Sequence, residues 1–301
     1  MNSITSKIQE LKKEKDAVIL AHYYTEENVQ ALADYVGDSY YLSKIATKVP
    51  NRIIVFCGVS FMGESAKILN PEKTVLMPDA LADCPMAHMA KIENIQSVKN
   101  KYKDLAVVCY INSTAEIKAY SDVCVTSSNA LKIIKKLSQK NIYFIPDANL
   151  GRYVAQFLPD KNFIFNDGYC HVHTGITAEA VKWARNIHTD AKVLAHPECT
   201  WDVLTLADYV GSTSGIIEYA TTHEGEFIIC TEPGILYKLK QKNPNKVFHL
   251  VGEGKSCIDM KKITLQKVAD TLEKMQHQVE LDETLRQKAF YALERMLELA
   301  E

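Results

Sequence analysis

The sequence predicts an α/β fold built from three homologous three-layer αβα units, each with a small parallel sheet, in a pseudo-threefold arrangement. Three observations predict it: a repeat of 86 to 88 residues, near-continuous apolar strands that alternate with helical segments, and one cysteine at the same place in every repeat. Strands that are apolar throughout are typical of parallel sheets covered by helices on both faces.

The repeat is clearest around three equivalent aspartates, which lie 88 and 86 residues apart. Each follows the tip of an apolar strand by 12 residues, and in two repeats that tip is a histidine. The three segments are ALADYVGDSYYLSKIA with Asp34 after His22, AYSDVCVTSSNALKII with Asp122 after Tyr110, and TLADYVGSTSGIIEYA with Asp208 after His196. Internal similarity at a fixed period indicates repeated structural units.

Each repeat is expected to run strand, helix, short strand, helix, strand, helix, strand. Right-handed crossovers place the carboxyl ends of parallel strands at one edge of the sheet, where ligands of open α/β sheets bind. A TIM barrel also alternates strands and helices, but its natural repeat is about 30 residues, so we favour three units. The expected boundaries are 1–90, 91–175 and 176–260 for the units and 261–301 for C-terminal helices.

One cysteine follows the last strand of each unit, in a loop rich in Gly, Asp, Pro or Ser. These are Cys84, Cys170 and Cys257, spaced 86 and 87 residues apart. Three convergent thiolates suit a zinc ion or an iron–sulfur cube, and the chain lacks the close CxxC pairs typical of structural zinc. We therefore predict a central [4Fe–4S] cluster with three cysteine ligands and one open iron, which can act as a Lewis acid.

The other cysteines lie in or beside apolar strands, where a free cysteine usually behaves as a small hydrophobic residue. A formal net charge of −2 gives no basic field for nucleic acid. No secretory signal and no apolar stretch near 20 residues is apparent, so we expect a cytoplasmic protein that binds no membrane. In a reducing compartment the cysteines are not a disulfide framework. The five buried candidates are Cys57, Cys109, Cys124, Cys199 and Cys230.

Hydroxyl residues stand where the second helix of each unit is expected to begin. They can be plain N-caps, worth about 1 kcal/mol each. Capping is compatible with binding, because free N–H groups and hydroxyls at helix ends hold carboxylates and phosphates. We therefore expect a pocket for a multiply anionic ligand. The residues are Ser39, Ser127 with Ser128, and Ser212 with Thr213.

Further polar residues at the strand tips are candidates for catalysis and substrate binding. Glu198, beside Pro197, is a candidate general base. Tyr24 and Tyr110 can hydrogen-bond a carbonyl or move a proton, whereas for Tyr23 aromatic packing is an equal alternative. His173, three residues after Cys170, can orient a substrate or the cluster. The other candidates at these strand tips are His22, His196 and Asn112.

These motifs together resemble the quinolinate synthase family. The matching pieces, in order over roughly residues 17 to 268, are AHYY, Asp38–Ser39, PDALADC, YIN, TSSNA, PDANLG, GYCHVH, HPEC, GSTSG and GKSCIDMKKITL. The resemblance implies a transferase of NAD biosynthesis that condenses iminoaspartate with dihydroxyacetone phosphate to quinolinate, releasing phosphate and water. The sequence leaves open whether functional coupling to an aspartate oxidase or dehydrogenase supplies the imine.

The resemblance also implies residue roles. Cys84, Cys170 and Cys257 match the cluster ligands, and Tyr24 and Glu198 match the acid–base residues. The matching substrate-binding set is His22, Ser39, Tyr110, Asn112, Ser127, His196, Glu198 and Thr213.

This sequence departs from the family pattern at three places. Thr25 replaces a common Gln, Asp83 replaces the usual Gly before the first cysteine, and PMAHM follows that cysteine in place of a Ser-Leu-Ala-Asp-like run. The third cysteine loop has no extra CxxC pair, so we expect no thiol switch there. Two rival functions stay open. An aconitase-like hydro-lyase would also use an open iron but would need no phosphate pocket. A structural or redox-sensing metal protein would need no clustered His, Tyr, Glu and Ser.

Overall fold

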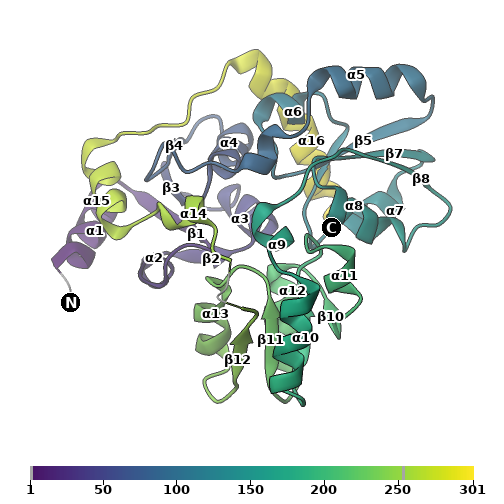
Figure 1. The fold of residues 1–301 in the computed structure, drawn as a ribbon. Helices are drawn as coiled ribbons and strands as arrows, with labels where there is room; N and C mark the ends of the chain where they lie inside the picture. Colours follow the sequence, from purple (N-terminus) through teal and green to yellow (C-terminus); the bar gives the residue numbers. More distant parts are fainter. Residues whose placement is uncertain (1–2, 253–254) are drawn as a thin grey trace.

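The computed structural model describes residues 3–252 and 255–301, and these form three four-stranded sheets with helices packed around them (Figure 1). Every strand pair in the three sheets is parallel. The strand order is the same each time, with the second strand outside the first and the third and fourth on its other side. The prediction of three homologous α/β units is confirmed, and the barrel alternative is wrong.

The twelve strands are short and mostly buried, as the apolar runs predicted. The first sheet, in the order β2-β1-β3-β4, contains β1 (Ala17–His22), β2 (Tyr35–Gly37), β3 (Ile53–Cys57) and β4 (Thr74–Leu76). The second, β6-β5-β7-β8, contains β5 (Leu105–Tyr110), β6 (Val123–Val125), β7 (Asn141–Ile145) and β8 (Asn162–Phe165). The third, β10-β9-β11-β12, contains β9 (Lys192–Ala195), β10 (Tyr209–Val210), β11 (Phe227–Cys230) and β12 (Phe248–Leu250).

Helices repeat in the same positions. Helices that lead into the three units are α1 (Ser3–Glu14), α5 (Ile92–Lys101) and α10 (Ala178–Ile187). Those between strands are α2 (Glu27–Leu32), α3 (Ser39–Ala46), α4 (Ser60–Leu69), α6 (Ala115–Ala119), α7 (Ala130–Lys136), α8 (Ala148–Ala155), α11 (Trp201–Leu204), α12 (Thr213–Thr222) and α13 (Ile235–Lys242). A short helix follows each fourth strand: η1 (Pro85–His88), α9 (His171–Thr174) and α14 (Ile258–Lys261). The chain ends in α15 (Leu265–Lys274) and α16 (Glu283–Ala300).

The repeated aspartates have one structural role in all three units. Each carboxylate accepts a hydrogen bond from a backbone N–H of the first strand of its own unit, 15 residues earlier. The bonds are Ile19 N to Asp34 Oδ2 (2.8 Å), Val107 N to Asp122 Oδ2 (2.7 Å) and Val193 N to Asp208 Oδ2 (2.8 Å). Each aspartate therefore fastens the start of the short second strand to the first, which fixes the same register in each sheet.

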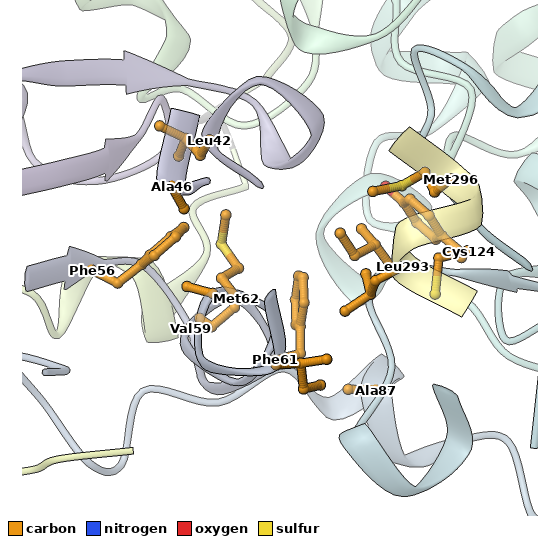
Figure 2. Packing of buried hydrophobic residues seen from close by; sticks show 14 of the residues in the cluster. Leu42, Ala46, Phe56, Val59, Phe61, Met62, Ala87, Cys124, Leu293 and Met296 are labelled. Atoms are coloured by element: carbon orange, nitrogen blue, oxygen red, sulfur yellow. The ribbon is translucent and has the colours of Figure 1, made fainter. Parts of the chain in front are cut away.

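The apolar core continues from the first unit into the second (Figure 2). Phe61 and Met62 of α4 and Leu293 and Met296 of α16 are buried in it, and Leu293 and Met296 lie beside Cys124 of β6. Helix α16 packs against α4, α6, α7 and β6, so the C-terminal segment joins the first two units. The C-terminal segment contains α15 and α16, and the position of α16 across two units was not expected from the sequence.

The five cysteines expected to be hydrophobic are buried, and all eight cysteines are free. Tyr23 is also buried, in the apolar cluster that contains β11 and α13, so its packing alternative is the correct one. A separate check of the described helices found none with the length and apolar character needed to cross a bilayer. The unit boundaries at residues 90, 175 and 260 stay a prediction.

Candidate active site

One cavity lies where the carboxyl ends of the three sheets meet, and it is lined from all three units. The space between its lining atoms is ≈ 770 Å³, part of it open to solvent, a size within the range of small-molecule sites. The predicted residues that line it are His22, Tyr24, Ser39, Cys84, Tyr110, Asn112, Ser127, Cys170, His173, His196, Glu198, Thr213 and Cys257.

The fold explains why these residues meet. β1 ends at His22 and β5 at Tyr110, while His196 directly follows β9, so the three equivalent strand tips reach the same place. Ser39 and Thr213 are the first residues of α3 and α12. Ser212 is not among the lining residues; its hydroxyl caps α12 by accepting from Gly215 N at 3.1 Å. Ser212 therefore caps α12, and its role in substrate binding stays a prediction.

The three cysteines occupy equivalent positions, each as the residue before the short helix that follows the fourth strand. Burial raises the pKa of all three thiols, to about 11 for Cys257. In each case a hydrogen bond from the backbone N–H three residues later lowers the pKa in part, because this bond stabilises the thiolate. The donors are Ala87 for Cys84, His173 for Cys170 and Met260 for Cys257.

The spacing of the sulfurs distinguishes a cluster from a single ion. A tetrahedral zinc with Zn–S bonds of about 2.3 Å holds its sulfurs about 3.8 Å apart. Among the described residues, Cys84, Cys170 and Cys257 do not form a group whose donor atoms all lie within 4.8 Å of one another. They nevertheless line one cavity, so this donor set fits a larger inorganic group better than one zinc ion.

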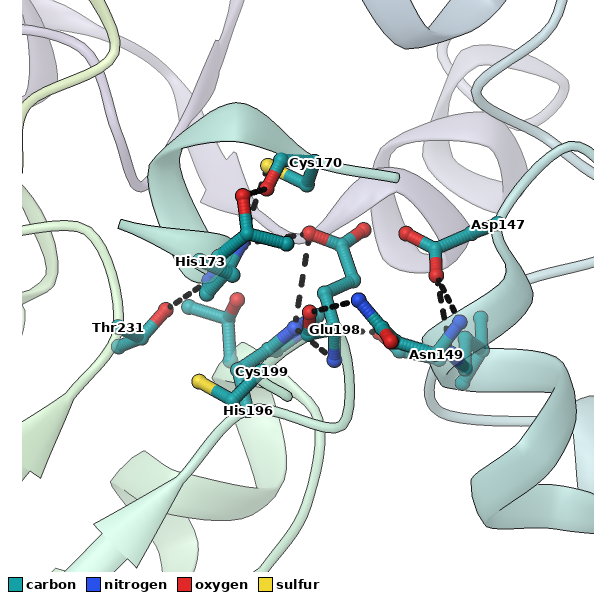
Figure 3. A network of polar contacts seen from close by, with 12 residues as sticks. Asp147, Asn149, Cys170, His173, His196, Glu198, Cys199 and Thr231 are labelled. Carbon is teal, nitrogen blue, oxygen red and sulfur yellow. Dashed lines mark hydrogen bonds and ion pairs between the residues drawn. The ribbon is translucent and has the colours of Figure 1, made fainter. Parts of the chain in front are cut away.

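Glu198 is buried between two histidines (Figure 3). Its Oε2 lies 2.6 Å from His173 Nδ1 and 3.7 Å from His196 Nδ1, and the two imidazole rings stack at 4.6 Å. Burial raises the pKa of Glu198, but the two histidines and the Tyr110 hydroxyl outweigh it, so the pKa lies well below its usual range. Glu198 is therefore a carboxylate.

His22 and His196 are held in the same way. The Nδ1 of each accepts a hydrogen bond from the backbone N–H two residues later, Tyr24 N at 3.2 Å and Glu198 N at 3.3 Å. Burial lowers the pKa of both histidines to about 3, so both are neutral. With Nδ1 accepting, the proton is on Nε2. The Nε2 of His196 lies 3.2 Å from Ser127 Oγ, so it is directed toward the cavity wall of the second unit.

A chain of hydrogen bonds connects Tyr24 to Glu198. The Tyr24 hydroxyl lies 2.9 Å from Thr213 Oγ1 and 2.8 Å from Thr231 Oγ1. Thr231 Oγ1 in turn lies 2.8 Å from His173 Nε2, whose other nitrogen contacts Glu198 (Figure 3). Burial raises the pKa of Tyr24 well above its usual value, and the nearby Glu198 charge adds to this, so the phenol is protonated.

Sequence reasoning missed Thr231 and Glu232, which follow β11 directly. Glu232 lines the cavity, is buried, and pairs with Lys261 at 3.1 Å. Its Oε1 also accepts from Cys257 N at 3.3 Å, while Lys261 Nζ donates to Tyr24 O at 2.8 Å. This pair therefore holds the third cysteine loop against the Tyr24 loop of the first unit.

Unsatisfied polar atoms mark the cavity as a binding site. Asn112 Oδ1 and Asp147 Oδ2 are buried without a hydrogen-bond partner among the described residues. A buried polar atom without a partner is costly, so it usually has a ligand or water. Asn112 lines the cavity, so a bound molecule with a donor group can pair with it.

The departures from the family pattern at Thr25 and Asp83 are both accommodated. Thr25 is buried, and its Oγ1 donates to His22 O at 2.9 Å. Asp83 accepts from Cys84 N at 2.8 Å and from the hydroxyl of Ser60, so its carboxylate fixes the first cysteine loop. A Gly at this position could not make these bonds, which means that this chain holds Cys84 with a side chain of its own.

Comparison with known proteins agrees with this site. The family model described as quinolinate synthetase A protein matches residues 6–298. Proteins named quinolinate synthase are similar over almost their whole length. That of Fusobacterium nucleatum is 54% identical over 98% of both chains, that of Clostridioides difficile 53% over 99% of this chain and 98% of its own, and that of Caldicellulosiruptor bescii 49% over 98% of both.

The match extends across all three units and every cavity-lining loop, so it is not limited to one shared domain. This chain belongs to the quinolinate synthetase A protein family.

Proposed function

We propose that this protein is a quinolinate synthase of NAD biosynthesis, a transferase that condenses iminoaspartate with dihydroxyacetone phosphate to give quinolinate, phosphate and water. Family membership and near-complete coverage by relatives of that name support the activity. The observation that carries the assignment to this site is the single cavity that gathers three equivalent cysteines with Glu198 and Tyr24.

The cofactor we propose is a [4Fe–4S] cluster held by Cys84, Cys170 and Cys257. Three thiols from three units supply soft ligands, and a backbone N–H at each short helix partly offsets the burial that raises their pKa. When bound, the cluster supplies one iron without a protein ligand, which acts as a Lewis acid on a substrate oxygen or nitrogen.

Neutral donors are proposed to hold the anionic substrates. His22 and His196 each carry their proton on Nε2 and stay uncharged, so they donate without competing as acids. Ser39 and Thr213 stand at the amino ends of α3 and α12, where N–H groups favour anions. The remaining members of the set are Tyr110, Asn112, Ser127 and His173.

Proton transfer is proposed to use Glu198 as base and Tyr24 as acid. Glu198 is ionised and buried, so its carboxylate is available to accept a proton, and its proton affinity rises when a substrate displaces the contacts that lower its pKa. Tyr24 is protonated, and its hydroxyl is fixed between two threonine hydroxyls. Thr231 and His173 connect Tyr24 to Glu198 through hydrogen bonds. A proton that Glu198 takes up can therefore be matched by a proton that Tyr24 releases.

Replacement of Glu198 tests this assignment. Glu198→Gln keeps the shape but removes the base, so we expect kcat to fall by about 100-fold or more while the cluster absorption is retained. Glu218→Gln, an exposed glutamate on α12, is the matched control and should keep full turnover. Unchanged quinolinate formation by Glu198→Gln, measured anaerobically, would remove Glu198 from the role of base.

We also propose a cytoplasmic location and functional coupling to an aspartate oxidase or dehydrogenase. Ligand cysteines must stay reduced, which a cytoplasmic environment ensures. Iminoaspartate is an imine that water hydrolyses, so an enzyme that forms it close by would supply this site. A coupled assay tests this: quinolinate yield should rise when the imine is generated in place instead of added.

A further inference from the structure

A second group of metal-binding side chains lies outside the cavity, in the third unit. It consists of His188, which directly follows α10, Glu226, which directly precedes β11, and His249 in β12. One donor atom from each lies within 4.8 Å of the other two. Because the cavity is at the carboxyl ends of the strands, this group is at the opposite end of the third sheet.

The three side chains are already in contact. His249 Nε2 lies 2.7 Å from Glu226 Oε2, and the rings of His188 and His249 stack with centroids 3.5 Å apart and planes at 15°. The side chain of Glu226 is 50% exposed and that of His249 is 19% exposed, so an ion can reach them from solvent. Parallel pairing of β11 with β12 and packing of α10 on β11 bring the three segments together, and the three donor groups meet where these elements adjoin.

The geometry points to a divalent transition-metal site formed by His188, Glu226 and His249, with water in the fourth position. Two imidazoles and one carboxylate are a recurrent three-ligand set for zinc. Zinc bonds of about 2.0–2.1 Å need donor atoms about 3.3 Å apart. Donor atoms that lie within 4.8 Å of one another reach this spacing when side-chain rotations shift them by roughly 1 Å, which partly exposed residues can make.

The chemistry also predicts selectivity. Imidazole nitrogen suits Zn²⁺, Co²⁺ and Ni²⁺, whereas Mg²⁺ and Ca²⁺ prefer sites made of oxygen ligands only. A bound ion would link the end of α10 to β11 and β12 and would thereby stabilise the third unit by mass action. The site is separate from the cavity and does not depend on the proposed reaction.

Anaerobically prepared holoenzyme, with cluster content read from its absorption, is dialysed against Zn²⁺ and analysed for metal. We expect one zinc ion per chain in the unmodified protein and none in His188→Gln and His249→Gln. His223→Gln, an exposed histidine of the same unit, is the matched control and should retain the ion. The same dialysis with Mg²⁺ or Ca²⁺ should leave no bound ion.

Crystals soaked in Zn²⁺ give an independent readout that does not require the variants to fold. Anomalous difference maps collected on either side of the zinc absorption edge should show a peak between His188, Glu226 and His249. Zinc retained by both variants, or a peak only at other residues, would overturn the proposal. Turnover by His249→Gln should stay normal, so failure of this site is distinct from failure of the proposed activity.

Discussion

Single hydrogen bonds decide what the cavity histidines can do. In both His22 and His196 a backbone N–H occupies Nδ1, so Nε2 must carry the proton and face the ligand. The equivalence arises because both lie at the carboxyl end of equivalent strands, where a turn brings the amide two residues later onto the ring. A neutral donor in a fixed orientation is the result.

This state of the histidines predicts a pH dependence of stability. A pKa of about 3 in the folded state, against about 6.5 in the unfolded chain, means that only the unfolded chain takes up the proton between these values. Stability is therefore complete above pH 6.5 and falls below it, by up to about 1.4 kcal/mol per pH unit for each histidine. The apparent Tm of the holoenzyme should drop between pH 7.5 and 5.5, and His22→Gln should show a shallower drop. Equal slopes would contradict the neutral assignment of His22.

Thr231 is the residue on which the connection between Tyr24 and Glu198 depends. Its single hydroxyl contacts both Tyr24 and His173, and it is buried. Thr231→Val removes the hydroxyl at almost constant volume, whereas Thr231→Ser retains it. We expect the valine variant to lose about 10- to 100-fold in kcat with little change in KM, and the serine variant to keep most of the activity. Equal losses in both variants would indicate a packing role only.

The sequence could not predict Thr231, because the repeat carries no signal there. The equivalent residues after β3 and β7 are Gly58 and Pro146, which have no side-chain donor. Residues that recur in the units, such as His22 with His196 and the three cysteines, were found from the repeat itself. For Ser212 the repeat gives a signal that is not specific. A hydroxyl residue at the start of a helix looks the same in sequence whether it caps the helix or lines the cavity.

At the scale of elements, the short helices after the cysteines determine the surroundings of the three sulfurs. Each is one turn that begins directly after its cysteine, so a backbone N–H returns to the sulfur three residues later. This requires only a strand end and a turn, which is why the loops can differ in sequence. In the first loop Asp83 adds a side-chain acceptor for Cys84 N.

Helix α16 was predicted as a helix, but its position was not. Its sequence is highly charged, and an amphipathic helix does not reveal its partner, since any apolar surface would bury its apolar face. In the structure Leu293 and Met296 enter the core shared by the first two units, and Arg295 donates to Asp122 O at 3.3 Å. The segment therefore acts as a clamp between these units.

Truncation of Leu293 tests this clamp. Leu293 is fully buried, so Leu293→Ala should lower the free energy of unfolding by about 2–5 kcal/mol. Tyr291 lies on the same helix and is 70% exposed, so Tyr291→Ala should change it by no more than about 0.5 kcal/mol. Differential scanning calorimetry on both variants checks the comparison, and equal Tm values would show that α16 does not join the units.

At the scale of the whole molecule, the threefold repetition makes one site out of three weak ones. A single unit offers one thiol and a few polar side chains at its sheet edge, which is too little to hold a cofactor. Three units that face one another place three thiols, two neutral histidines, Glu198 and Tyr24 around one cavity. The period in the sequence predicted this convergence, because equivalent loops of equivalent units must leave the same edge of each sheet.

Metal and sulfide analysis of anaerobically reconstituted protein, combined with Mössbauer spectroscopy, tests this convergence most directly. We predict one [4Fe–4S] cluster per chain, lost in Cys84→Ala, Cys170→Ala and Cys257→Ala alike. Cys57→Ala and Cys230→Ala, which remove buried cysteines of the strands, should retain the cluster. A cluster that survives the loss of any one of the three loop cysteines would contradict the proposed ligand set. Protein that takes up no iron during reconstitution would contradict it as well.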